Sequence, residues 1–444
     1  MSIISEAKKG DRLLLMGNDA IARGALEAGV KVAAGYPGTP SSEIVQSLAA
    51  AAADLNLYVE WSVNEKVALE VASAGAYSGL RSLCVMKQVG VNVAADFLLH
   101  IAEYGTRSGL VLVSCEDPGA LSSTNEGDSR PYCKMMEFPL IEPADFQEAK
   151  DMTRWAFDLS EEIHNVVMLR SVTRMSHASG NLVTGDMPEK TPTPWFECSG
   201  GFMDQDTGPV LTFPTLVDSQ RRRQKAGLQK AVRLFESSPF NSYAGPADPE
   251  LLVVTSSAAH AYCREAVSLL DLKERVGILK LGTTWPLPPK LLCGHLAASD
   301  RVFVVEEGTP FLEDNVKNLC AENAAGLGIK TFYGRRDSVL PPVNELNPDV
   351  VMAGLCRIFD LEYSAMDASY RELADQAMQA APQRELTFCP GCPHRASYWL
   401  LNEALTMDNR QGFVCGDIGC YTMGAAECGF KTVKLSMAMG SGLG

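Results

Sequence analysis

Residues 30–43, VKVAAGYPGTPSSE, indicate the fold of the amino-terminal part of the chain. The apolar run Val30–Ala34 is typical of a buried strand. Two glycines then allow a sharp turn, and Thr39-Pro40 is a typical helix start, with Thr39 as N-cap and Pro40 in the first helical position. Such a strand-to-helix turn presents N–H groups and hydroxyls at the carboxyl end of a parallel sheet, where anions and small ligands bind. The alternative is that Thr39 only caps the helix.

Short apolar runs separated by helical segments continue through most of the chain, and a helix capped by Asn18 precedes the first run. Because the runs are continuously apolar, they suit parallel strands covered by helices on both faces. We therefore expect an α/β protein with doubly wound parallel-sheet domains. The predicted strands are Val30–Ala34, Ser82–Met86, Leu110–Ser114, Asn165–Leu169, Leu251–Thr255, Val276–Leu281, Arg301–Val305 and Ile329–Tyr333.

Changes in composition along the chain suggest its domain boundaries. We expect a first α/β domain over residues 1–185, a linker over 186–247, a second α/β domain over 248–362, a helical connector over 363–384, and the start of a third domain over 385–444. A length of 444 residues fits two to four domains at about 150 residues each.

Composition also excludes several classes of partner. The chain has 39 Lys+Arg against 54 Asp+Glu, a net charge of −15, so we expect no nucleic acid and no anionic membrane as partner. No apolar stretch approaches the ~18 residues of a membrane span, and the first residues lack the apolar core of a signal peptide, so we expect a cytoplasmic protein. In that compartment the 13 cysteines indicate buried thiols, a metal or a cluster rather than disulfides.

The segment 63–79 predicts an informative helix. Ala68, Ala72 and Gly75 fall on one narrow stripe that lets another backbone approach closely, and Glu65 lies at its edge near the helix start. This carboxylate is either a functional acid or a solvated residue favoured by the helix dipole. Around the axis of this predicted helix, Glu70 lies about 140° from Glu65, so we do not expect both side chains to line the same pocket.

Two further polar segments follow predicted strands. Lys87, Gln88 and Asn92 lie near the same sheet edge, and Arg130 closes the polar loop 122–130, where its guanidinium is suited to clamp a carboxylate. Ordinary loops are the alternative for both segments.

Five of the thirteen cysteines lie between residues 389 and 428. Cys389 and Cys392 share one tight turn, and 27 residues separate Cys392 from Cys420, a spacing that can hold an iron–sulfur cluster. A zinc site that adds Cys415 is a second possibility. Buried or redox-active thiols are the third.

Taken together, these motifs resemble the alpha subunits of the indolepyruvate:ferredoxin oxidoreductases, and more distantly other 2-oxoacid:ferredoxin oxidoreductases. The resemblance covers essentially the whole chain and is carried by residues 35–43, 64–68, 86–96, 388–395 and 416–421. It implies thiamine-diphosphate-enzyme domains: a pyrimidine-binding domain, a transketolase-C-terminal-like domain and the opening of a diphosphate-binding domain.

The resemblance also implies an activity. Enzymes of this family use thiamine diphosphate, Mg²⁺ and [4Fe–4S] clusters to convert aryl 2-oxo acids and coenzyme A to acyl-CoA and CO₂, with a beta subunit as partner and ferredoxin as electron acceptor. The implied site residues are Glu65 as the acid that activates the cofactor, Gly38 and Asn92 beside the cofactor, Thr39 and Arg130 for the substrate, and Cys389, Cys392 and Cys420 for the cluster.

One family motif is missing from this sequence. The magnesium diphosphate is held in the family by Gly-Asp-x followed by asparagine 25–30 residues later, and no such pair occurs here. We therefore expect a chain that is truncated inside its third domain and inactive by itself. The alternatives are a non-catalytic scaffold or metal-binding subunit with the same fold, or a related enzyme with another 2-oxo acid as substrate.

Overall fold

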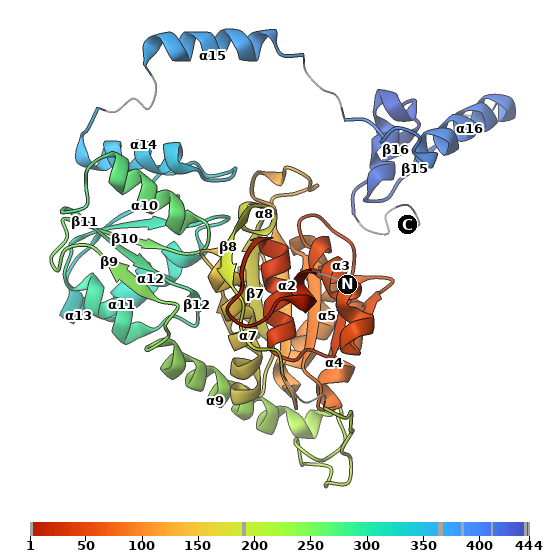
Figure 1. Ribbon diagram of the computed structural model, residues 1–444, viewed down its shortest axis with the longest axis horizontal. Helices are drawn as coiled ribbons and strands as arrows, with labels where there is room; N and C mark the ends of the chain where they lie inside the picture. The colour runs from red at the N-terminus through yellow and green to blue at the C-terminus, as the bar shows by residue number, and fades with distance from the viewer. Residues whose placement is uncertain are drawn as a thin grey trace. The chain divides into compact units, whose positions relative to one another are not determined.

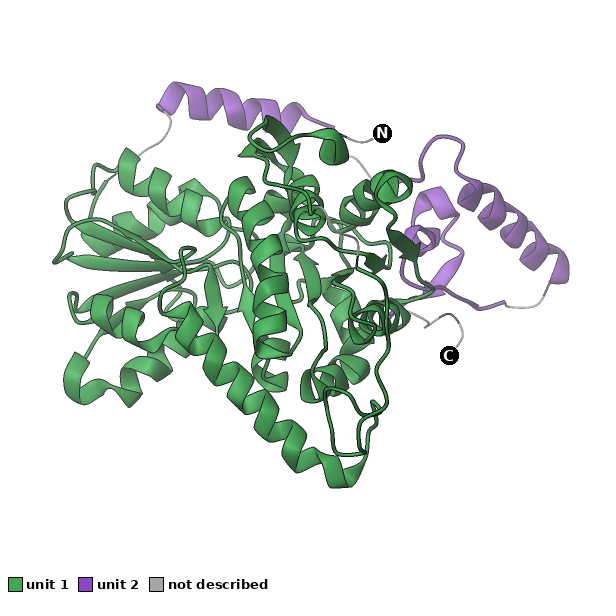
Figure 2. Ribbon diagram, turned by 60° about the horizontal axis from the view of Figure 1, so that its bottom comes forward, with its two compact units in different colours: residues 1–363 green, residues 364–444 purple. Residues whose placement is uncertain are grey.

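The computed structural model describes residues 3–188, 192–362, 367–382, 386–409, 412–438 and 442. The chain divides into two units, residues 1–363 and residues 364–444 (Figure 2). The first unit has two large sheets, each covered by helices on both faces (Figure 1).

The first sheet has seven strands in the order β12-β6-β7-β5-β4-β2-β3. All neighbouring pairs are parallel except β12 and β6. Every residue of the central strands β4, β5 and β7 is buried, as the apolar runs predict. The strands are β2 Val32–Gly35, β3 Tyr58–Trp61, β4 Ser82–Lys87, β5 Leu110–Glu116, β6 Leu140–Ile141, β7 Val167–Val172 and β12 Thr283–Trp285.

Two apolar layers lie against this sheet. One face is covered by α2, α3 and α7, and the other by α4, α5 and α6. The helices of this part are α1 Ile3–Glu6, α2 Gly17–Glu27, α3 Ser42–Leu55, α4 Glu65–Tyr77, α5 Gln88–Tyr104, α6 Arg130–Met136, α7 Phe146–Ile163, α8 Thr173–His177 and α9 Val217–Phe235. A separate antiparallel pair joins β1 Arg12–Met16 to β8 Ser179–Val183.

The second sheet has the order β14-β13-β10-β11-β9 and is parallel except for β9. Helices α10 and α14 cover one face, and α11 and α12 cover the other. The elements are β9 Ser242–Ala244, β10 Leu251–Thr255, α10 Ala259–Leu269, β11 Val276–Lys280, α11 Pro289–Leu296, β13 Arg301–Val305, α12 Phe311–Glu322, α13 Ala324–Leu327, β14 Thr331–Tyr333 and α14 Pro348–Phe359.

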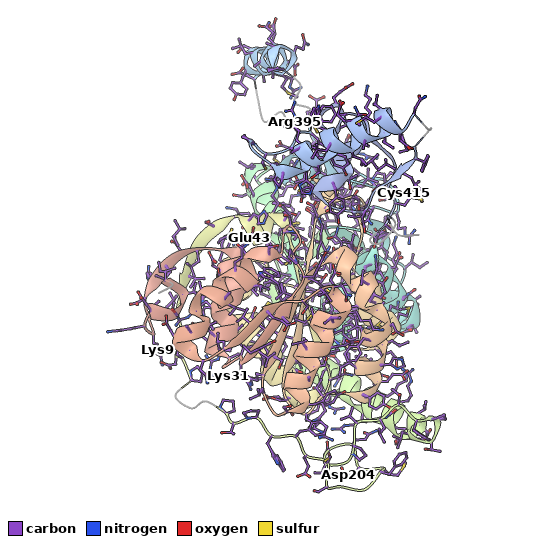
Figure 3. All side chains as sticks on the ribbon, turned by 90° about the vertical axis from the view of Figure 1, so that its right-hand side faces the viewer. Lys9, Lys31, Glu43, Asp204, Arg395 and Cys415 are labelled. Carbon is purple, nitrogen blue, oxygen red and sulfur yellow. The ribbon has the colours of Figure 1, made fainter. Side chains whose placement is uncertain are left out.

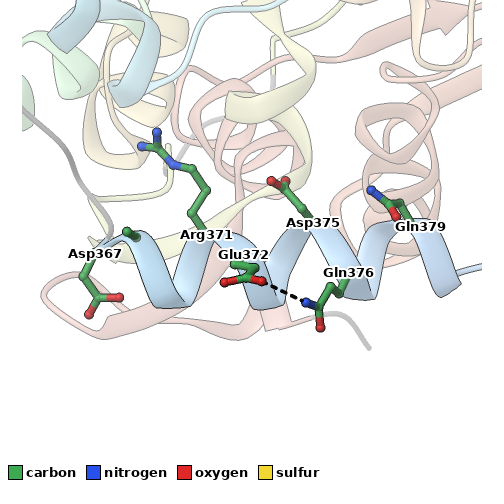
Figure 4. Close-up of a pocket in the computed structure, with 7 residues that line it drawn as sticks. Asp367, Arg371, Glu372, Asp375, Gln376 and Gln379 are labelled. Carbon is green, nitrogen blue, oxygen red and sulfur yellow. Dashed lines mark hydrogen bonds between the residues drawn. The ribbon is translucent and has the colours of Figure 1, made fainter.

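The second unit contains two longer helices, α15 Ala368–Ala380 and α16 Pro393–Asp408, and a short parallel pair, β15 Val414–Cys415 with β16 Val433–Leu435. A small apolar cluster around Phe388, Tyr398 and Val433 holds α16 against the strands. Helix α15 buries none of its residues. The shallow hollow along it is lined by that helix alone (Figure 4), so it forms no enclosed site.

Each of the eight predicted strands overlaps a strand of the structure, but the two predicted helix caps are wrong. Helix α3 begins at Ser42, because the Gly38 carbonyl accepts hydrogen bonds from the N–H groups of Ser41 and Ser42 and forms a turn after Thr39. Helix α2 begins at Gly17, and the Asn18 amide instead donates to the Pro40 carbonyl at 2.7 Å.

The second α/β part also recruits residues outside the predicted range 248–362. Its edge strand β9 lies inside the predicted linker 186–247, where it pairs with β11. Strand β12 leaves this part altogether and pairs with β6 of the first sheet. Strand β12 therefore connects the two large sheets of the first unit.

Candidate functional site

Strands β2, β4, β5 and β7 are parallel, so their carboxyl ends meet at one edge of the first sheet. The loop that follows β2 and the amino terminus of α5, which follows β4, lie at this edge. Glu43 (labelled in Figure 3), at the start of α3, accepts a hydrogen bond from Asn18 at 2.8 Å and fixes the end of the loop. Ligands of open α/β sheets bind at such an edge.

Glu65 is buried beside this edge. It is the first residue of α4, whose amino terminus is capped by the Asn64 side chain accepting from the Val67 N–H at 2.9 Å. Glu65 is only 3% exposed, so the solvated alternative is wrong. Within the described part of the chain its Oε2 atom has no hydrogen-bond partner. Burial raises the pKa of Glu65, because the charged form loses its hydration.

A glycine on the neighbouring helix makes room for this carboxyl group. A Cβ atom on Gly90 of α5 would lie 2.5 Å from Glu65 Cγ and 2.6 Å from Glu65 Oε1. Only a residue without a side chain allows this approach. Gly90 is not among the residues expected at the site from the sequence, although a lone glycine inside a helical pattern is a recognised signal of close packing.

Glu70 has a different environment. It is partly exposed on α4, and its charge acts on Lys66, which pairs with Asp96 on the surface. Of these two carboxylates, Glu65 is the one that is buried at the sheet edge.

Lys87 and Gln88 also lie at this edge, as expected. Lys87 ends β4 and is 8% exposed, and its ammonium donates to the Ser122 carbonyl at 2.9 Å. Burial lowers the pKa of Lys87, and the nearby Asp117 charge partly opposes this effect. Gln88 begins α5 and is 3% exposed, and neither atom of its amide has a partner among the residues described.

The other residues expected near the ligand are more peripheral. Gly38 lies against Lys87, since a Cβ atom there would be 3.1 Å from Lys87 Cβ. Thr39 is exposed. Asn92 is also exposed, and its side chain accepts a hydrogen bond from the Tyr132 hydroxyl at 2.5 Å. Of these residues, Gly38 alone packs against the buried edge.

Arg130 does not occupy the position expected for a substrate clamp. Its side chain is fully buried, and its guanidinium lies 2.6 Å from both Asp128 Oδ2 and Glu306 Oε2 and donates to the Thr309 carbonyl at 2.7 Å. These partners come from its own loop and from the second α/β part, so the side chain links the two parts and presents no face to a substrate.

The expected metal ligands do not come together either. Cys389 and Cys392 share a turn, closed by a hydrogen bond from the Cys392 N–H to the Cys389 carbonyl at 3.0 Å. Over the described ranges, however, no three His, Cys, Asp or Glu side chains form a group able to hold a metal ion. The structure therefore presents neither the cluster site with Cys420 nor the zinc site that adds Cys415 (labelled in Figure 3).

None of the described helices combines the length and the hydrophobicity needed to span a bilayer.

Comparisons with known proteins agree with this architecture. The family model "Pyruvate flavodoxin/ferredoxin oxidoreductase, thiamine diP-bdg" matches residues 23–188, the part that contains the candidate site. The chain is 37% identical over 440 residues to the indolepyruvate oxidoreductase subunit IorA of Thermococcus kodakarensis, and the match covers 98% of this chain and 66% of that protein. The same subunit of Methanothermobacter thermautotrophicus is also 37% identical, over 99% of this chain and 69% of that protein.

Among solved structures, the chain is similar to a 2-oxoglutarate:ferredoxin oxidoreductase from Magnetococcus marinus with a TM-score of 0.61. The match covers 79% of this chain and 65% of that chain at 15% sequence identity. A split-gene transketolase gives a TM-score of 0.51 at 13% identity. At these identities the likeness concerns the fold, and it confirms the expected doubly wound α/β class.

Proposed function

The chain belongs to the family of the indolepyruvate oxidoreductase IorA subunits, and we propose on this premise that it provides the aminopyrimidine side of a thiamine diphosphate site. The enzyme would oxidatively decarboxylate aryl 2-oxo acids to the aryl-acetyl-CoA and CO₂. The chain spans about two thirds of the length of the curated relatives, so the activity of the whole enzyme is part of the proposal.

The observation that carries the proposal is the Oε2 atom of Glu65, which has no hydrogen-bond partner among the residues that the structure describes. A buried carboxyl group without a hydrogen bond is costly, so it needs a partner in the functional state. A nitrogen of the aminopyrimidine ring would supply that partner, and Gly90 leaves the carboxyl group free of a crowding side chain. The residues at this edge therefore fit the pyrimidine half of the cofactor.

When bound, thiamine diphosphate supplies the electron sink that a 2-oxo acid lacks on losing CO₂. The contribution of this chain is to hold or move a proton at Glu65 Oε2. Because burial raises the pKa of Glu65, its carboxyl group binds a proton at a higher pH than an exposed glutamate does. Its 3% exposure also keeps bulk water away from that proton.

The magnesium ion and the iron–sulfur cluster are not assigned to the described residues. Among these residues, no group of three or more His, Cys, Asp or Glu side chains is able to hold a metal ion, so we assign no ligand of the diphosphate's Mg²⁺. We assign no electron-transfer step to Cys389, Cys392 or Cys420 for the same reason.

Partners and substrate follow from the relatives. The curated relatives are named as subunits, so we infer a complex with a second, beta subunit. The solved relative is named a ferredoxin oxidoreductase with coenzyme A bound, so we infer ferredoxin as electron acceptor and coenzyme A as co-substrate. A different 2-oxo acid is the second candidate, because 199 residues are 30% identical to a 2-oxoglutarate synthase subunit, KorA.

The test compares Glu65→Gln with Glu70→Gln in the enzyme assembled with its partner subunit. The measurement is reduction of a low-potential dye that depends on an aryl 2-oxo acid and coenzyme A. Loss of the acid is expected to lower the rate by about 100-fold or more at Glu65, the usual contribution of a proton-transfer group. Glu70→Gln removes a carboxylate from the same helix and is expected to stay within about threefold of the native rate. An active Glu65→Gln enzyme would refute the assignment, and an assembled native complex without activity would favour a scaffold.

A further inference from the structure

We propose that Lys87 and Gln88 form the subsite that binds the anionic head of the 2-oxo acid, its carboxylate and the adjacent keto oxygen. This inference rests on the proposed function, since it assigns a substrate contact within the same site. Neither residue is needed for the assignment of Glu65.

Gln88 provides the first observation. Its amide carries two N–H donors and one carbonyl acceptor, and both Nε2 and Oε1 are unpartnered within the described structure at 3% exposure. The side chain is enclosed by the loop that follows β5, because a Cβ atom on Gly127 would lie 3.2 Å from Gln88 Cγ. A buried, unpaired amide is rare in native proteins and indicates a missing polar partner.

Lys87 provides the second observation. An ammonium group has three N–H donors, and the one hydrogen bond that the described structure gives it goes to the Ser122 carbonyl. Its stem is held in place by the turn after β2, where Gly38 lies close to Lys87 Cβ. A nearly buried ammonium group whose other N–H groups have no acceptor is stabilised by an anionic partner.

The amino terminus of α5 contributes a field of the matching sign, which the charge of Asp117 partly opposes. Gln88 begins a helix of 17 residues, so N–H groups without partners inside the helix and the positive end of its dipole lie at this point. The negative charge of Asp117 acts on Lys87. The Asp117 carboxylate accepts hydrogen bonds from other groups, namely the Ser122 N–H at 2.7 Å and the hydroxyls of Ser123 at 2.5 Å and Thr173 at 2.9 Å.

These groups suit the head of a 2-oxo acid. Its carboxylate would accept from the free N–H groups of Lys87, and its keto oxygen or second carboxylate oxygen would accept from Gln88 Nε2. Hydrogen bonds from a charged donor to a carboxylate are the stronger kind, so the pair would contribute much of the affinity for the anion. A neutral ester of the same acid would lose the charge-assisted part.

The test measures binding of phenylpyruvate, an aryl 2-oxo acid, and of its methyl ester to the full chain by calorimetry. We expect the native chain to bind the acid at least tenfold more tightly than the ester. Gln88→Glu keeps the size of the side chain and adds a negative charge next to Lys87, so it is expected to weaken binding of the acid at least tenfold and that of the ester by much less. Gln46→Glu makes the same chemical change at an exposed position of α3 and is expected to change neither more than twofold.

Equal binding of acid and ester by the native chain, or an unchanged affinity in Gln88→Glu, would overturn the proposal. So would a native chain that binds no 2-oxo acid. Lys87→Met gives a second, independent variant if Gln88→Glu fails to fold, which circular dichroism detects.

Cofactor binding separates this inference from the proposed function. In the assembled enzyme, Gln88→Glu is expected to raise the KM for the acid and to leave thiamine diphosphate binding within twofold. Loss of cofactor binding in Gln88→Glu would contradict a role in substrate binding. An active Glu65→Gln enzyme, with Gln88-dependent binding of the acid, would refute the proposed function alone.

Discussion

Replacing Gly90 with alanine tests whether the close approach of α5 to Glu65 matters for function. The added Cβ atom would lie 2.5 Å from Glu65 Cγ, 2.6 Å from Oε1 and 2.8 Å from Cδ. Carbon atoms in favourable contact are about 3.5–4.0 Å apart. The carboxyl group must therefore move by about 1 Å, or the two helices must separate.

The effect on stability is expected to be small. Overpacking costs about 1–3 kcal/mol, and alanine is favoured over glycine inside a helix by about 1 kcal/mol. The net destabilisation is then about 0–2 kcal/mol, which leaves most of the protein folded. The effect on activity is expected to be larger, because a displacement of about 1 Å at a reacting group can lower the rate about 100-fold.

The assay combines thermal unfolding of the chain with dye reduction by the assembled enzyme. Gly294→Ala is the matched control: Gly294 lies in α11, and a Cβ atom there would meet nothing within 4 Å. It is expected to stabilise the protein by about 0.5–1 kcal/mol through helix propensity and to leave the rate unchanged. A Gly90→Ala enzyme with native rate and native thiamine diphosphate affinity would refute the idea that Gly90 positions Glu65.

Two further predictions concern the buried charges of the first unit. Arg130→Met is expected to lower the free energy of unfolding by about 3–5 kcal/mol in urea titrations, because it leaves Asp128 and Glu306 buried without their cation. Glu307 has a pKa raised by burial to about 7, so the folded state binds more protons than the unfolded state between about pH 4.5 and 7. The contribution of Glu307 to the free energy of unfolding is therefore most favourable below pH 4.5 and is lost as the pH rises through 7. Glu307→Gln is expected to remove this pH-dependent loss of stability, which amounts to up to about 3 kcal/mol.

Each of these variants has a control in the same chain. Arg222→Met removes an exposed arginine that pairs with Asp218, and such pairs contribute less than about 1 kcal/mol. An Arg130→Met protein as stable as Arg222→Met would contradict the structural role of Arg130. Glu274→Gln removes an exposed carboxylate and should leave the pH profile of unfolding parallel to the native one. A Glu307→Gln profile that is also parallel would contradict the pKa shift.

The sequence correctly predicts the class of fold, and it predicts the sheet edge at which the candidate site lies. Continuously apolar runs such as Leu110–Ser114 identify strands buried on both faces, because polar side chains cannot be hidden there without partners. The glycine-rich turn after Val30–Ala34 marked the carboxyl edge, and helical geometry set Glu65 apart from Glu70. These are local properties, which depend on residues within a few positions of one another.

The environment of the charged groups depends on the tertiary structure. Glu65 is buried because Gly90, on the next helix, admits it, and the sequence around Glu65 is equally compatible with a solvated carboxylate. Arg130 is a structural link because Glu306, 176 positions away, meets its guanidinium. Burial and electrostatic pairing are set by contacts between distant segments, so the periodicity of a single helix or loop does not encode them. The same reason applies to the cysteines, whose spacing permits a metal site that the described residues do not form.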